Sequence, residues 1–99
     1  MDLMILQKRI KVVEVNNGSE PNMGRSDLKA GQITIAKNMP RDIKNATLIH
    51  EVIHFILDDL GLHGNLKESF VASLSTALFS VMMENKKILL EMLNTDLTK

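Results

Sequence analysis

The sequence has 99 residues, enough for one domain with one modest hydrophobic core. Its twelve basic and twelve acidic residues give a net charge of zero, which excludes the broad basic surface typical of proteins that bind nucleic acid or anionic membranes. Cysteine is absent, so disulfides and thiolate metal sites are excluded too. With no signal-peptide pattern and no apolar run of membrane-spanning length, these features predict a cytoplasmic protein.

The first third of the chain has the composition of a small sheet. Lys8–Val15 is rich in β-branched residues and predicts a strand that extends back to Leu3. A dense group of turn formers follows at residues 16–22, and residues 23–28 predict a second, short strand. Together with the strand described next, they indicate an antiparallel sheet of two to three strands over about residues 3–36.

Gln32–Ala36 alternates between apolar and polar residues, as a half-buried strand does. The alternation places Ile33 and Ile35 inward, and Gln32, Thr34 and Ala36 outward. An exposed edge of such a sheet, next to a catalytic helix, can bind an extended peptide as an additional strand. The sequence does not say which edge is open.

A long helix is predicted over about residues 40–60. Pro40 suits a first helical turn, and Gly61 suits the left-handed residue just after a helix end. Apolar residues form one broad stripe at helical spacing: Leu48, Ile49, Val52, Ile53, Ile56, Leu57 and Leu60. A second, polar stripe consists of His50, Glu51, His54 and Asp58.

The polar stripe contains the motif H-E-x-x-H, formed by His50, Glu51 and His54. Residues four apart on a helix have Cβ atoms roughly 5–6 Å apart, so two imidazoles can converge on one zinc ion at about 2.0–2.1 Å. Glu51 is rotated about 100° from His50 and can reach a water in an open coordination position. The motif therefore predicts a zinc site with Glu51 as the general base of a hydrolytic reaction.

The last third of the chain predicts two more helices, over about residues 66–84 and 86–95, with a break near Asn85. The first carries an apolar stripe and many small residues, which permit close packing against the metal-binding helix. The terminal helix either packs on the core or mediates the formation of a homodimer. The α+β fold is thus a small sheet packed on the metal-binding helix and a second long helix.

A third zinc ligand must come from outside the motif, and the candidates are Glu68, His63, Asp58 and Asp59. Glu68 is the first choice because it lies in the first turn of the next helix, and His63 is the second. A competing interpretation makes Glu68 part of a capping box with Asn65. At 1.5 Å per residue, His54 and Glu68 lie at different heights in a simple helical hairpin, so the two helices must cross obliquely or be joined by a longer loop.

The motif, the preceding strand 31–35 and the following helix up to Asn85 resemble small zincin-like metallopeptidase domains, in particular the ImmA/IrrE type and its short phage or prophage relatives. The resemblance implies that His50, His54 and Glu68 bind zinc and that Glu51 activates water for peptide hydrolysis. The chain has no tyrosine to serve as an oxyanion donor, a role that zinc, helped by His63, fills in this interpretation. The alternative is a catalytically silent zincin-fold protein of phage type that binds a partner protein through its sheet edge or terminal helix.

Overall fold

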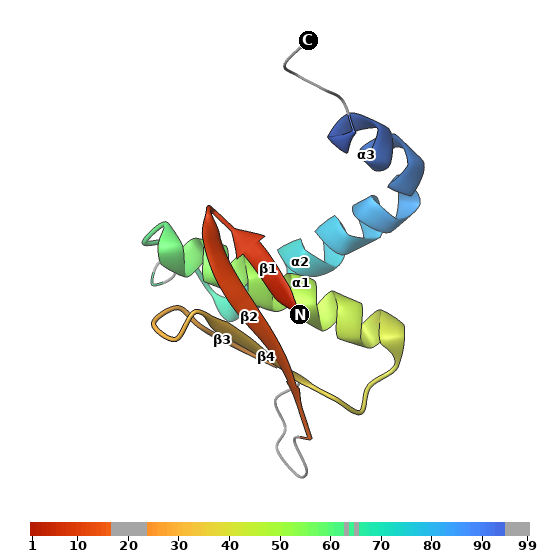
Figure 1. The fold of residues 1–99 in the computed structure, drawn as a ribbon. Helices are drawn as coiled ribbons and strands as arrows, with labels where there is room; N and C mark the ends of the chain where they lie inside the picture. The colour runs from red at the N-terminus through yellow and green to blue at the C-terminus, as the bar shows by residue number, and fades with distance from the viewer. Residues whose placement is uncertain (17–23, 63, 65, 95–99) are drawn as a thin grey trace.

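A computed structural model describes residues 1–16, 24–62, 64 and 66–94. Four strands, β1 (Asp2–Ile5), β2 (Lys8–Val15), β3 (Gly24–Asp27) and β4 (Gln32–Ala36), precede three helices, α1 (Arg41–Asp59), α2 (Glu68–Glu84) and α3 (Lys86–Leu93) (Figure 1). The α+β class predicted from the sequence is confirmed. No helix within the described ranges is both long and apolar enough to cross a membrane.

The sheet has four strands in the order β1-β2-β4-β3, and it is mixed. β1 pairs antiparallel with β2 and β3 antiparallel with β4, but β2 and β4 run parallel. The prediction of an antiparallel sheet of two to three strands is therefore wrong. Burial explains the order. β2 and β4 carry most of the buried apolar residues of the sheet and occupy its centre, whereas β3, which has a polar sequence, lies at an edge.

A tight hairpin joins β1 to β2, where the sequence predicted a single strand. Ile5 pairs with Lys8, so the loop consists of Leu6 and Gln7 alone. Both have positive φ, 49° and 71°, as a type I′ turn requires. Because leucine and glutamine rarely adopt positive φ, the sequence carries no turn signal at this position.

One face of the sheet packs on α1 and forms the core. Ile33 from β4 and Phe55 from α1 are 0% and 1% exposed, and the buried set is Ile5, Ile10, Val12, Ile33, Ile35 and Phe55. Leu48, Val52 and Ile56 of the predicted apolar stripe pack against this set. Ala36, which the alternation placed outward, is buried, because it ends β4 where the backbone bends toward α1.

The helix α1 ends as its sequence predicts. Gly61 has φ of +73°, its N–H donates to the Asp58 carbonyl, and the Leu62 N–H donates to the Leu57 carbonyl. These are the hydrogen bonds of a left-handed helix cap. Pro40 occupies the cap position before Arg41 at the other end.

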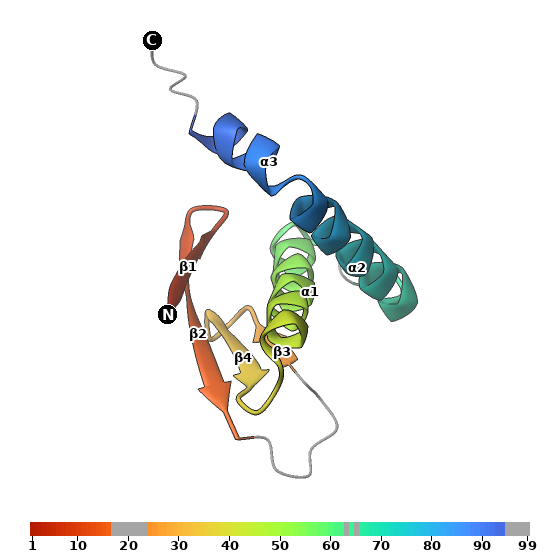
Figure 2. The same ribbon diagram turned by 90° about the vertical axis from the view of Figure 1, so that its right-hand side faces the viewer.

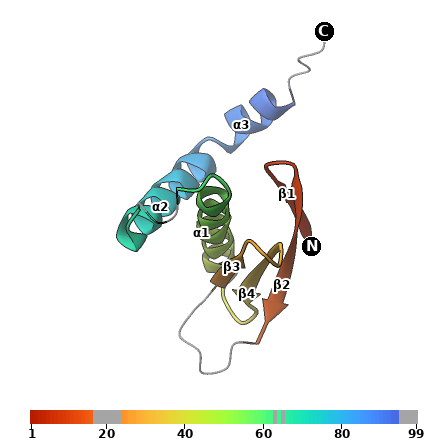
Figure 3. The same cartoon turned by 90° about the vertical axis from the view of Figure 1, so that its left-hand side faces the viewer.

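The molecule is layered, with the sheet, α1 and α2 in that order (Figure 2). α2 crosses α1 obliquely, one of the two arrangements that the heights of His54 and Glu68 allowed, and α3 extends beyond the C-terminal end of α2 (Figure 3). No residue of α3 is buried. The packing of the terminal helix on the core, one of the two alternatives raised by the sequence, is therefore not what the structure shows.

Candidate metal centre

Three side chains from two helices converge where α2 crosses α1. His50 Nε2 lies 2.8 Å from Glu68 Oε1, and His54 Nε2 lies 2.8 Å from Glu68 Oε2. The two Nε2 atoms are 3.1 Å apart. The structure thus brings together His50, His54 and Glu68, the three residues for which the sequence predicted a common metal ion, and among the described residues they form the one group with this geometry.

The local sequence explains how each side chain reaches this point. The four-residue spacing puts both histidines on one face of α1, with their rings 4.7 Å apart. Glu68 is the first residue of α2, after Lys67 at the cap position, and no side chain caps this helix end. Asn65, the other residue of the predicted capping box, lies outside the described residues, and the Glu68 carboxylate extends across to α1. Its negative charge also favours the N-terminal end of a helix.

A serine that the sequence analysis did not single out orients His50. The Ser75 hydroxyl donates to the Val71 carbonyl at 2.8 Å and lies 3.1 Å from His50 Nδ1. With its hydrogen donated to that carbonyl, Ser75 Oγ can accept a hydrogen bond from Nδ1–H, and in this tautomer His50 Nε2 keeps the lone pair that a metal ion needs. A hydrogen bond of this kind is typical of histidines that bind metals.

The donor set fits a small divalent cation. Ligand atoms at about 2.0–2.1 Å from zinc lie roughly 3.3 Å apart in tetrahedral geometry, so the observed separations of 2.8–3.1 Å need only a slight opening. Two imidazoles and one carboxylate are the ligands of many catalytic zinc sites, which keep a fourth position open. The His50 and His54 side chains are 24% and 13% exposed, whereas that of Glu68 is 65% exposed, so the group is open to solvent on the Glu68 side.

Glu51, the candidate base, is buried and has only 8% of its surface exposed. Burial raises the pKa of its carboxyl group, and the nearby Glu68 carboxylate raises it further. His50, His54 and a hydrogen bond with Ser26 act in the opposite direction on this pKa. Glu51 therefore lies on the core side of α1, between the histidines and β3, and not on a wholly exposed polar face.

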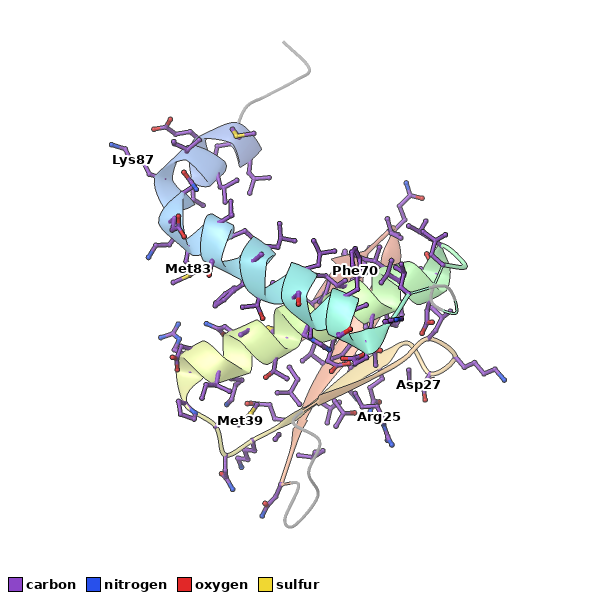
Figure 4. The ribbon with its side chains drawn as sticks, turned by 180° about the vertical axis from the view of Figure 1, so that it is seen from behind. Arg25, Asp27, Met39, Phe70, Met83 and Lys87 are labelled. Atoms are coloured by element: carbon purple, nitrogen blue, oxygen red, sulfur yellow. The ribbon has the colours of Figure 1, made fainter. Side chains whose placement is uncertain are left out.

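Strand β3 approaches α1 closely at Glu51 because it begins with a glycine. A Cβ atom at Gly24 would lie 2.8 Å from Thr47 Cγ2 and 3.0 Å from Glu51 Cγ. Gly24 and Ser26 are half-buried, whereas Arg25 and Asp27 are exposed and point away from α1 (Figure 4). The sequence predicted a short strand over residues 23–28 but gave no sign of these contacts, because they depend on how that strand packs against α1.

The two aspartates that were candidate ligands do not join this group. Asp59 forms an ion pair with Lys8 at the start of β2, and Asp58 is not among the converging residues. His63, the second choice as ligand and the candidate oxyanion donor, lies outside the described residues, as does Asn65. No protein-family model, curated protein or solved structure matches the chain.

Proposed function

We propose that the protein is a zinc-dependent metallopeptidase, in which His50, His54 and Glu68 hold the ion and Glu51 is the general base. The observation that carries this proposal is the convergence of three ligand atoms from α1 and α2 within 4.8 Å of one another, in a chain whose helix also carries the glutamate of H-E-x-x-H. The sequence resemblance to zincin-like domains of the ImmA/IrrE type supports the same assignment.

Each residue has one role in this mechanism. When bound, zinc supplies a Lewis acid that polarises the scissile carbonyl and lowers the pKa of water to about 7. Glu51 Oε accepts the proton of the attacking water and returns it to the leaving amine. Ser75 keeps His50 in the tautomer that exposes Nε2, and Ser26 fixes the Glu51 carboxylate by a hydrogen bond.

The edge strand β3 is the route by which a peptide substrate reaches Glu51. In the described part of the sheet β3 pairs with β4 on one side only, and its first residue contacts Glu51 through the close approach at Gly24. A peptide in extended conformation can pair with the other side of β3 through main-chain hydrogen bonds. The contact of β3 with Glu51 supports this edge over the opposite one, because the other edge strand, β1, is separated from β3 by β2 and β4.

The first experiment measures zinc content in untagged protein by elemental analysis. We expect about one zinc per chain in the wild type, and a loss of zinc in His50→Ala, His54→Ala and Glu68→Ala. Asp42→Asn, which changes an exposed acid in the first turn of α1, is the matched control and should keep the metal. A folded wild type that takes up no added zinc would rule out the centre.

The second experiment separates catalysis from metal binding. Glu51→Gln should retain zinc and the fold while hydrolysis of a mixture of quenched fluorescent peptides falls by at least about a hundredfold. Equal turnover by the wild type and a clean Glu51→Gln preparation would show that Glu51 is not the base. A zinc-loaded wild type that cleaves none of the peptides would favour the silent, partner-binding alternative.

A further inference from the structure

The outer surface of α2 is unusual for a helix in contact with water. Residues 69–83 include no charged side chain, yet most of them are exposed. Only Val71 and Ser75 are buried, both on the side that packs against α1. In Figure 4 the side chains of α3 and of the end of α2, with Met83 and Lys87 labelled, project where no other described element covers them. A contiguous exposed apolar surface marks an interaction site.

Six exposed positions, five on α2 and one at its cap residue Lys67, follow a coiled-coil spacing and define a seam. Their separations alternate between three and four residues, which keeps them on one stripe of a helix. Phe70, Leu74 and Val81 are 52%, 42% and 53% exposed. The seam consists of Lys67, Phe70, Leu74, Ala77, Val81 and Glu84.

We propose that the seam binds the same seam of a second copy of this chain, with the two α2 helices antiparallel. In this register Lys67 faces Glu84 of the second copy, and Glu84 faces its Lys67. Phe70 then lies opposite Val81, and Leu74 lies opposite Ala77. Every layer therefore combines opposite charges, or a larger with a smaller apolar residue, as interdigitating helices require.

The order of the residues favours a second copy over other occupants. A parallel pair would place Lys67 against Lys67 and Glu84 against Glu84, which is repulsive at both ends. The antiparallel arrangement has a two-fold axis between Leu74 and Ala77, and a self-complementary patch of this kind is what a two-fold homodimer uses. An unrelated partner would not require the charges at the two ends of the seam to be opposite.

The extent of the seam sets the expected strength. One helix of 17 residues presents less surface than the roughly 800 Å² per partner of a standard interface. We therefore expect a reversible dimer with a dissociation constant of about micromolar order. Because Glu68 points to α1 and not along the seam, the dimer leaves the candidate metal centre open, and the proposal is independent of the proposed enzymatic function.

The test is sedimentation equilibrium on the untagged full chain, with single charge reversals at the two ends of the seam. Lys67→Glu creates two acidic pairs in the homodimer, and Glu84→Lys creates two basic pairs, so each should weaken dimerisation by roughly tenfold. An equimolar mixture of the two variants restores an opposite pair at both ends and should dimerise like the wild type. Lys29→Glu, at an exposed turn outside the seam, is the matched control and should leave the dissociation constant unchanged.

Each result decides the proposal. Wild-type dimers, weakened by either reversal and restored on mixing, establish the antiparallel seam. A wild type that stays monomeric from micromolar to about millimolar concentration overturns it and points to a different partner. Dimers that are insensitive to both reversals, or that are not restored on mixing, overturn the register. Leu74→Glu, in the centre of the seam, should abolish the dimer without changing the helical circular dichroism of the diluted protein.

Discussion

The two halves of the molecule differ in how far their apolar side chains are buried. The half formed by the sheet and α1 contains the hydrophobic core, in which Phe55 is 1% exposed. In the half formed by α2 and α3, most apolar side chains other than Val71 remain in contact with solvent, and Phe70 is 52% exposed. The contrast shows that apolar content does not by itself locate a core, because burial also requires a second layer, and α2 has α1 on one side only. The candidate metal centre lies at the junction of the two halves.

The largest difference between the halves should appear in the two phenylalanines. Phe55→Ala removes a ring from the closed core and should lower the free energy of unfolding by about 3–5 kcal/mol. Phe70→Ala changes an exposed side chain and should shift it by no more than about 0.5 kcal/mol in dilute protein. Urea denaturation followed by circular dichroism measures both. Equal losses would mean that α2 is packed as tightly as α1.

A second prediction concerns the contact between β3 and α1. Gly24→Ala places a methyl group against Thr47 Cγ2 and Glu51 Cγ, and should destabilise the fold by about 1–3 kcal/mol. Thr47→Ser removes that Cγ2 but keeps the hydroxyl that donates to the Ile43 carbonyl. In the double variant, part of the loss should therefore be recovered, and a double-mutant cycle measures the coupling. Strict additivity would contradict the close approach.

The next prediction tests whether a side chain of α2 affects the zinc affinity of the candidate metal centre. Ser75→Ala removes the acceptor for His50 Nδ1–H, and should weaken zinc binding by about tenfold while the helix content is kept. Competition with a chromophoric chelator gives the affinity. Ser73→Ala, at an exposed position of the same helix, is the control. Unchanged affinity in Ser75→Ala would show that His50 is oriented by other contacts.

The smallest expected effect is a gain in stability. The raised pKa of Glu51 means that its carboxyl group favours the folded state at low pH, and that this contribution is lost as pH rises through the folded-state pKa. Glu51→Gln should therefore stabilise metal-free protein at neutral pH by about 1 kcal/mol, or about 4–8 °C in Tm. The gain should disappear below the ordinary glutamate pKa of about 4.3, as thermal melts across pH can show. A lower Tm at neutral pH would contradict the burial cost.

The sequence predicted the helices better than the sheet, for physical reasons. Pro40 and Gly61 are local signals, and the bounds they indicated lie within a residue of those of α1. The order of the strands depends on contacts between distant residues, and the parallel pair of β2 with β4 left no trace in either strand alone. The Leu6–Gln7 turn likewise uses residues that seldom form one.

The same distinction holds within the site. H-E-x-x-H is a local pattern, and Glu68 was named because it opens the helix that follows. The contacts of Gly24 and of Ser75, which lies 25 residues after His50, depend on how the elements pack, so the sequence did not predict them. Glu51 was assigned to a polar stripe, because helical periodicity alone does not show that β3 covers that side of α1.

The position of the centre across two helices has a consequence for motion. α2 follows α1 in the chain after residues 60–67 and, among the described elements, packs mainly on α1, so an ion held by His50, His54 and Glu68 would act as a cross-link between the two helices. By thermodynamic reciprocity, whatever holds α2 in place also increases affinity for the ion, and the ion shifts the equilibrium between the open and closed positions of α2 by the same factor. Amide hydrogen exchange in α2 would then report metal occupancy, while exchange in the central strands would be nearly indifferent to it.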